Sequence, residues 1–440
     1  MLSISMMLVS AADAATWSEV GWSSSGEAPD LARDSETGDV HLAWLDGGYA
    51  NHAVFRADGE LLETNRESAW SGEGNGWTFG PGVAVGPESD VYLSFKTGEG
   101  GWVYSTWLTV RSSGSWSSPI ALQQSAERGY GSQVAADELG ATVVVERADE
   151  VPYGAMSHWT VQGGSLVASG DLTEARVDDR VDVIAGAQAG DRHAFAGYPN
   201  PGGHIYYAWS GDGGLSWSGG GAIESGSCGG GRNGQPDAAL DAEGRVHLVY
   251  GCSEDSDVGG PSVRHAIISG HTVISDSVLT SDLTEWHLSL GIARVATRGD
   301  HVVIAWLTHD SGALYVSHSE DGGGSWLDPV QIAGQGGDAE GRNAPAIVAT
   351  EGAVFLAWSD GSTVHLTRGE IQEDEPEEEP HDTDDTDDTA SDGDSGEQGD
   401  EHPDRRPREI PEEDESTGCN TLPGPLGLWL LGLALSRRRR

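Results

Sequence analysis

Pairs of short hydrophobic segments separated by polar turns recur along most of the chain. Each pair opens with a small or proline-led apolar segment and ends in a second apolar segment close to an aromatic residue. The seven pairs begin at Ala28, Gly80, Gly131, Arg180, Gln235, Leu288 and Ala344. Their spacing of about fifty residues is typical of a four-stranded β-propeller blade and not of a helical repeat.

Further alternating segments lie between these pairs and predict outer strands. "HIYYAWS", "ALYVSHS" and "WVYSTWLTV" follow the pairs as third strands, and "SSPIALQQ", "HTVISDSVLT" and "LDPVQIAG" follow as fourth strands. We therefore predict an all-β fold, a β-propeller of seven four-stranded blades. Six blades is the alternative, if the weak unit around Val143 is an insertion.

The last unit lacks a fourth strand. Its third strand ends near "TVHLTRGEI", and apolar residues then become rare. We expect "ATWSEVGW", which begins at Ala15, to complete this blade. Pairing the two ends of the propeller would remove the sheet edges that otherwise promote aggregation.

One octapeptide, Ser-x-Asp-x-Gly-x-x-Trp, occurs twice. Its fixed residues are Ser210, Asp212, Gly214 and Trp217 in the first copy, and Ser319, Asp321, Gly323 and Trp326 in the second. The octapeptide resembles the Asp-box of sialidase-type BNR repeats. The resemblance implies a sialidase-like propeller with the box between the third and fourth strands of a blade, facing away from the active site. The aspartate would then accept backbone N–H groups of its own turn, as a structural element.

Catalysis does not follow from the resemblance. Sialidases of that family use three arginines, a Tyr–Glu nucleophile and an aspartate acid/base, with an aromatic-Arg-Ile-Pro stretch in the first blade. Here the first unit reads "APDLARD", and no catalytic residue can be assigned by matching positions. We predict a binding or adhesion module. A sialidase-type exo-glycosidase acting on acidic sugars is the alternative enzyme, and a structural envelope protein is a third reading.

Arginines recur in the loops that precede predicted first strands, two of them followed by asparagine. Such loops meet at one mouth of a propeller channel, where guanidinium groups bind carboxylates with two hydrogen bonds. We therefore predict a site for a glycan or acidic saccharide that comprises Arg128, Arg180, Arg232, Asn233, Arg342 and Asn343. The alternative is that each arginine pairs with an acidic neighbour, such as Glu127, Asp179 or Glu340.

Other ligand classes find less support. The formal charge of −47 argues against nucleic acid and against attraction to anionic membrane surfaces. The histidines are scattered along the sequence without ligand spacing, so we predict neither a metal site nor a cofactor. Cys228 and Cys252 lie at the same predicted mouth, and we expect them to form a disulfide in an exported protein.

The two ends of the chain indicate export. Residues 1–15 have the apolar run and the small residues of a signal peptide, and residues 16–369 form the predicted propeller. Residues 370–417 are acidic and almost free of apolar side chains, which predicts a disordered stalk.

Residues 418–440 have three parts: Gly418 with Cys419, an apolar run, and four arginines. They resemble the MYXO-CTERM signal of myxobacterial-type surface proteins. The resemblance implies cleavage by a sorting protease near Gly418 and anchoring of Cys419 at the bacterial cell surface or outer membrane. Membrane contact would then be made only through this anchor.

Overall fold

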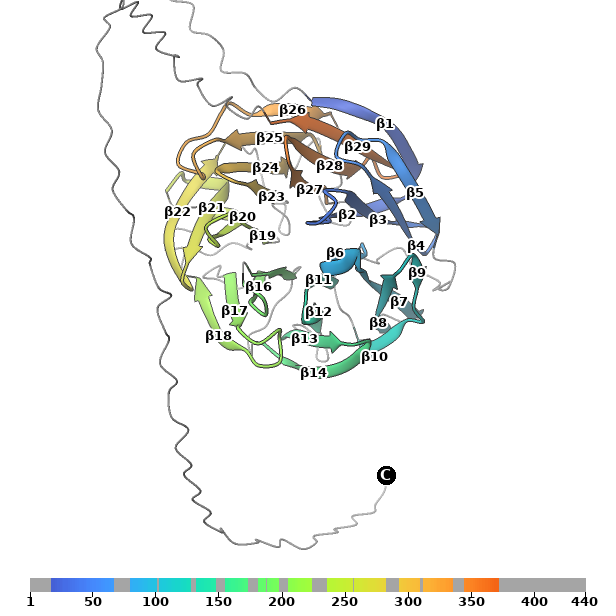
Figure 1. Cartoon of the computed structure of the whole chain (residues 1–440). Coiled ribbons are helices and arrows are strands. Elements are labelled where there is room, and N and C mark those ends of the chain that lie inside the picture. Colours follow the sequence, from blue (N-terminus) through green and yellow to red (C-terminus); the bar gives the residue numbers. More distant parts are fainter. Residues whose placement is uncertain are drawn as a thin grey trace, which may run out of the picture. The chain divides into compact units, whose positions relative to one another are not determined.

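The described residues form seven antiparallel sheets arranged around a central axis, as the propeller prediction requires (Figure 1). The computed structural model describes residues 17–66, 80–100, 103–127, 132–147, 155–172, 181–186, 188–197, 205–223, 236–255, 257–281, 293–308, 312–334 and 344–371. All of these belong to one unit, Met1–Pro376. The seven-bladed prediction is confirmed, and the unit around Val143 is a complete blade instead of an insertion.

Each blade contributes its strands in order from the axis to the rim (Figure 1). The first strands are β2 (Glu27–Arg33), β6 (Gly82–Val85), β11 (Ser132–Asp137), β15 (Val181–Ala185), β19 (Asp237–Leu240), β23 (Ala293–Arg298) and β27 (Ala346–Thr350). The second strands are β3 (Val40–Asp46), β7 (Val91–Gly100), β12 (Gly140–Arg147), β16 (Arg192–Gly197), β20 (Val246–Asp255), β24 (His301–Leu307) and β28 (Ala353–Ser359).

The outer strands follow the same order. The third strands are β4 (Tyr49–Phe55), β8 (Val103–Ser112), β13 (Ala155–Gln162), β17 (Ile205–Ser210), β21 (Gly260–Ser269), β25 (Leu314–Ser319) and β29 (Thr363–Glu370). The fourth strands are β5 (Leu61–Arg66), β10 (Ile120–Glu127), β14 (Ser165–Asp171), β18 (Ser218–Ile223), β22 (Thr272–Thr280), β26 (Val330–Ala333) and β1 (Trp17–Ser25). A short strand, β9 (Ser115–Trp116), also pairs with β8.

Burial explains why the inner strands read as continuous apolar segments. Each blade packs between two others, so both faces of a second strand are covered, and Ala141–Val145 of β12 are all buried. The fourth strands lie at the rim, and β14 is exposed along most of its length. Hydrophobic clusters therefore form between neighbouring blades, as where Leu42 and Phe55 of the first blade meet Phe355 of the last.

The N-terminal strand completes the last blade, which confirms the predicted ring closure. β1 pairs antiparallel with β29, from Trp17 opposite Gly369 to Ser25 opposite Thr363. Trp22 of β1 also lies edge-on to Trp44 and Phe55, with ring centroids 5.3 Å apart in both cases. The two ends of the described chain are thus held together by backbone pairing and aromatic packing.

Helical structure is nearly absent from the described residues. Within the described ranges the helical element is η1 (Pro87–Ser89), a single 3-10 turn. No helix in these ranges is long and apolar enough to cross a membrane. The predicted signal peptide, acidic stalk and sorting signal lie outside the described residues and stay predictions, although β29 ends at Glu370, beside the predicted end of the propeller.

Candidate functional site

A cavity of about 380 Å³ lies on the propeller axis, lined by the first strands of all seven blades. Its volume is within the range of small-ligand sites in proteins. Apolar walls are contributed by residues such as Val134, Ile184 and Val295. Charged and amide side chains interrupt these walls, so the cavity joins an apolar surface to a set of polar groups.

One repeated position of the first strands carries a polar side chain in five of the seven blades. We call this set the channel ring; its members that line the cavity are Asp30, Gln133, Asp182, Asp237, Arg294 and Ala346. In the remaining blade the corresponding residue is Gly82. Each ring residue directly precedes an apolar residue of the same strand, such as Leu31 after Asp30. One layer of the channel thus carries most of its charge.

Three ring carboxylates also connect neighbouring blades. Asp30 Oδ2 accepts a hydrogen bond from the N–H of Val83 on the next blade, at 2.7 Å. Asp182 Oδ2 accepts the N–H of Ala238 at 2.8 Å, and Asp237 Oδ2 accepts the N–H of Val295 at 2.7 Å. Each of these hydrogen bonds uses one carboxyl oxygen of its aspartate.

The environment of the ring favours protonated carboxyl groups. Burial raises the pKa of Asp30 to about 7, with the nearby charge of Asp237 adding to the effect and Arg294 opposing it. Burial, again with the charge of Asp237, raises the pKa of Asp182 well above its ordinary value. Arg294 partly opposes the rise in the pKa of both Asp30 and Asp182, and its Nε lies 3.9 Å from Asp237 Oδ1. The ring can therefore exchange protons near neutral pH.

Asp30→Asn is expected to raise stability at pH 8 by about 2 kcal/mol and to leave it nearly unchanged at pH 4. Between these pH values the folded protein keeps the Asp30 proton while the unfolded chain loses it, so the wild type loses stability as the pH rises. Asparagine retains an oxygen acceptor for Val83. Part of the Asp30 surface is open to the channel, and water there offsets some of the cost of burial. Urea unfolding at both pH values measures the difference.

Asp300→Asn is the matched control, because Asp300 is exposed in the turn between β23 and β24 and does not line the cavity. It makes the same charge change away from the cavity, and urea unfolding at pH 8 should give a stability close to that of the wild type. An Asp30→Asn variant that is no more stable than wild type at pH 8 would show that burial does not disfavour the ionised form of Asp30.

The six residues predicted to bind a ligand lie outside the described residues. Arg128, Arg180, Arg232, Asn233, Arg342 and Asn343 all precede first strands in sequence, and Arg180 comes two residues before Asp182 of the ring. Their role stays a prediction. The channel ring was missed by the sequence reasoning, although a signal existed: charged residues at Asp30, Asp182, Asp237 and Arg294 stand where an inner strand begins.

Both octapeptides lie in the connection between a third and a fourth strand, β17 to β18 and β25 to β26. In the first, Ser210 Oγ donates to Asp212 Oδ1 at 2.8 Å and accepts the N–H of Gly214 at 2.9 Å. Asp212 also accepts the N–H of Ser216 at 2.8 Å. The second copy repeats this pattern with Ser319, Asp321, Gly323 and Ser325. The aspartates are therefore occupied by their own turns.

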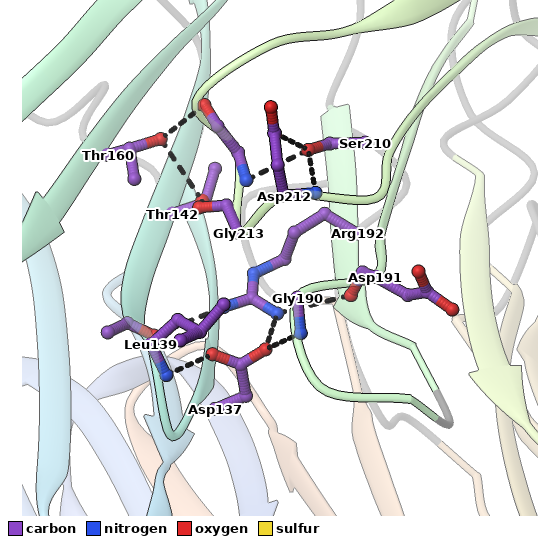
Figure 2. A network of polar contacts seen from close by, with 12 residues as sticks. Asp137, Leu139, Thr142, Thr160, Gly190, Asp191, Arg192, Ser210, Asp212 and Gly213 are labelled. Atoms are coloured by element: carbon purple, nitrogen blue, oxygen red, sulfur yellow. Dashed lines mark hydrogen bonds and ion pairs between the residues drawn. The ribbon is translucent and has the colours of Figure 1, made fainter. Parts of the chain in front are cut away.

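Each octapeptide also packs against the preceding blade. Thr160 Oγ1 donates to the carbonyl of Gly214 at 2.8 Å, and Figure 2 shows Thr142, Thr160 and Gly213 gathered beside this turn. Gly214 has φ +83° and lies against two threonine hydroxyls, so a side chain there would be strained and would clash. In the second copy Trp326 lies edge-on to His265, with centroids 5.3 Å apart. No residue of either octapeptide lines the described cavity.

Asp321→Ala is expected to destabilise the protein by about 1–2 kcal/mol without affecting binding at the channel. The substitution removes the acceptor for Ser319 Oγ and for the N–H of Ser325, and exposed turn hydrogen bonds have this scale. Thermal unfolding measures the loss. Glu320→Ala, an exposed neighbour in the same turn, is the control and should be neutral. A variant that lost ligand binding at an unchanged melting temperature would contradict the scaffold role.

Six of the described histidines, although scattered in sequence, lie in three pairs in space. The rings of His41 and His52 stack, and their nearest nitrogens are 3.0 Å apart; His247 with His265 and His301 with His318 repeat this arrangement. Burial lowers the pKa of His41 and His318 to about 4 and that of His265 to about 3, so these rings are neutral at pH 7. Among the described residues no three His, Cys, Asp or Glu side chains converge as a metal site.

Cys252, at the end of a buried stretch of β20, is fully buried and takes part in a disulfide. Cys228 lies outside the described residues, so the pairing of these two cysteines stays a prediction.

Comparison with known proteins supports the fold. No family model matches the sequence, and no curated protein is similar to it. Among solved structures, the BP39L lectin from Burkholderia pseudomallei is 13% identical with a TM-score of 0.54, over 78% of this chain and 95% of the lectin. A PL25 polysaccharide lyase, an ulvan lyase bound to -[GlcA(1-4)Rha3S]-, is 12% identical with a TM-score of 0.50, over 78% of this chain and 93% of the lyase. At these low sequence identities, the structural similarity establishes a shared propeller fold and no shared function.

Proposed function

We propose that the protein is an exported, surface-anchored propeller that binds a glycan at the axial channel. The observation that carries this proposal is the cavity of about 380 Å³ with carboxyl, amide and guanidinium groups in one layer. Carboxylate and amide oxygens accept hydrogen bonds from sugar hydroxyl groups, and a guanidinium group donates hydrogen bonds to sugar oxygens. The BP39L lectin and the polysaccharide lyase bound to -[GlcA(1-4)Rha3S]- share this propeller architecture.

The two octapeptides support a sialidase-type assignment of the blades. We regard them as Asp-boxes because their serine, aspartate and tryptophan are all used within the turn or against the preceding blade. This assignment makes the boxes structural and leaves the channel as the place for a ligand.

A glycan array probed with the full chain tests the binding proposal. We expect binding to a defined set of glycans and its reduction at least tenfold when Gln133 and Arg294 are replaced by Leu and Met, which removes an amide and a charge from the ring. Asp300→Asn should bind like the wild type. A folded protein that binds no glycan, or a ring variant that binds unchanged, would contradict the proposal.

A glycosidase is the second candidate, and one observation favours it. Asp30 holds a proton near neutral pH in the same cavity as Asp237, and glycosidases need one protonated and one ionised carboxyl group. A fluorogenic sialoside and a panel of aryl glycosides test this activity. Turnover that disappears in Asp30→Asn and shows a pH profile falling above pH 7 would favour an enzyme, and a lack of turnover across the panel would favour a binding module.

The C-terminal signal gives the proposed location. Gly418 and Cys419 are followed by an apolar run and four arginines, the order of a removable anchor signal. Cys419→Ala is expected to release the protein into the medium or leave it uncleaved in the inner membrane, with binding by the propeller unchanged. Cell fractionation and mass spectrometry of the mature C-terminus measure this, and Ser416→Ala serves as control. Recovery of residues beyond Cys419 in the mature surface protein would exclude such processing.

A further inference from the structure

One arginine that lines the axial cavity has no hydrogen-bond or ion-pair partner among the described residues. This arginine is Arg33, the last residue of β2, and its Nε is buried without an acceptor. Every other arginine whose side chain the structure describes forms an ion pair with a carboxylate; these are Arg56, Arg111, Arg192, Arg245, Arg264, Arg294, Arg298 and Arg368. A partly buried guanidinium group without an acceptor is unfavourable in a folded protein.

A second arginine, Arg298, lies near Arg33 at the same end of the channel. Each is the last residue of its first strand, and β27 of the last blade lies between β23 and β2 (Figure 1). Burial and then the positive charge of Arg298 lower the pKa of Arg33 below its ordinary value. The two guanidinium groups therefore repel each other, and a negatively charged group beside both would relieve this repulsion.

Two carboxylates lie near Arg33, but neither accepts a hydrogen bond from it. Asp34 is 1% exposed, and its Oδ1 accepts the N–H of Glu36 at 2.8 Å, within its own turn. Glu351 lies 4.0 Å from Arg298 and its side chain is 78% exposed, so water screens this contact. Both carboxylates only partly oppose the fall in the pKa of Arg33. Because Nε is buried, a ligand in the cavity would be bound through the terminal N–H groups of Arg33.

We propose that Arg33 binds the acidic group of a saccharide, a carboxylate or a sulfate group, and that the charge of Arg298 adds to the attraction. This inference rests on the proposed glycan-binding function and specifies its ligand class. A guanidinium group donates charge-assisted hydrogen bonds to such an oxyanion. The anionic group would supply the acceptor that Arg33 lacks and reduce its repulsion with Arg298.

The channel ring is compatible with an acidic saccharide at this end of the cavity. Asp30 lies three residues before Arg33 on β2, which corresponds to about 10 Å along the strand. Burial raises the pKa of Asp30 to about 7 and that of Asp182 well above its ordinary value, so both carboxyl groups hold a proton more readily than exposed ones. The ring can bind hydroxyl groups of a sugar while Arg33 binds the acid, over a distance that a disaccharide can span.

Isothermal titration calorimetry of the full chain at pH 6 tests the inference with three probes. Digalacturonic acid carries the acidic groups, its dimethyl ester has nearly the same size without the charge, and sodium sulfate carries the charge without the sugar. We expect the acid to bind at least tenfold more tightly than the ester, the scale of losing a charge-assisted hydrogen bond. Sulfate alone should bind more weakly than the acid and compete with it.

Two variants and a control locate the effect. Arg33→Met keeps an apolar side chain and removes the charge, so it should weaken binding of the acid at least tenfold and leave binding of the ester unchanged. Its melting temperature without ligand should not fall, because Arg33 gives up no hydrogen bond. Arg298→Gln should weaken the acid by less, since Arg298 does not line the cavity. Arg56→Met makes the same change at an exposed arginine away from the cavity and should bind both disaccharides like the wild type.

Failure of this inference can be distinguished from failure of the proposed function. Equal binding of acid and ester, or binding of the acid that Arg33→Met leaves unchanged, would overturn the inference while the channel still binds glycans. If neither disaccharide binds, the glycan array decides: bound acidic glycans that Arg33→Met no longer binds support the inference, and a bound set of neutral glycans overturns it. If no saccharide binds in either experiment, the proposed function falls and this inference falls with it, even if sulfate alone binds.

Discussion

Asp137→Ala is expected to destabilise the propeller by about 3–5 kcal/mol, the usual cost of leaving a buried charge without its partner. Arg192, on β16, is fully buried and is among the largest side chains without exposed surface. It forms an ion pair with Asp137, at the end of β11 in the preceding blade, and donates to the carbonyl of Gly140 at 3.2 Å (Figure 2). Asp137 also accepts the N–H of Gly190 at 2.7 Å.

The pKa of Asp137 is consistent with a stabilising ion pair between Asp137 and Arg192. Burial by itself would raise the pKa of Asp137, but hydrogen bonds from Arg192 and Gly190 outweigh it, and the pKa lies below its ordinary value. The stabilisation is therefore present above the unfolded pKa of about 4 and is lost as the pH falls through the folded value. Because the pair joins two blades, its loss should lower the cooperativity of unfolding as well as the midpoint.

Chemical denaturation at pH 7 measures the loss of stability in Asp137→Ala. Two further variants separate the contribution of the ion pair from other effects. Glu138→Ala, an exposed neighbour in the same turn, should change stability by less than about 0.5 kcal/mol. The double variant Asp137→Ala with Arg192→Leu should be more stable than Asp137→Ala alone, because an apolar side chain leaves no unpaired charge. A double variant less stable than the single one would show that packing of the arginine, and not its charge, carries the interaction.

The blade pattern could be predicted from the sequence because each inner strand is buried on both faces. Segments such as Val302–Leu307 in β24 are apolar throughout, and polar turns separate them at regular intervals. Closure by the N-terminal strand was predictable for a similar reason, since the last unit had three strands and one apolar segment remained. These features depend on local pattern and on counting strands.

The channel ring and the buried charges depend on where different blades meet, which no local pattern reveals. Asp30 in "APDLARD" resembles a turn residue beside a proline, and its position in the channel follows only from the closed ring. Arg192 in "GDRHAF" resembles an exposed turn residue. It is instead fully buried and forms an ion pair with Asp137 of the preceding blade, 55 positions earlier in the sequence. The histidine pairs likewise require the register between second and third strands: His247 and His265 are 18 residues apart and meet diagonally.

Deletion of residues 16–22 is expected to have the largest effect of all, leaving the propeller unfolded or aggregated at 37 °C. The deletion removes the part of β1 that pairs with Gly369, Arg368 and Thr367, and it exposes the edge of β29. It also removes Trp22 from its contacts with Trp44 and Phe55. Losing one large aromatic side chain from a core costs about 3–5 kcal/mol, and a whole domain is stable by only about 5–15 kcal/mol.

A graded series separates loss of the edge strand from loss of the aromatic contact. Trp22→Ala keeps the strand and should lower the melting temperature without aggregation, whereas Ser18→Ala changes an exposed position of β1 and should be neutral. Size-exclusion chromatography with light scattering reports association, and thermal unfolding reports stability. A peptide of residues 16–25, added in excess to the deleted protein, should restore part of the melting temperature by pairing with β29. A deleted protein that stays monomeric and melts like the wild type would mean that the ring is closed by its blade-to-blade packing alone, with β1 only covering an edge that is already stable.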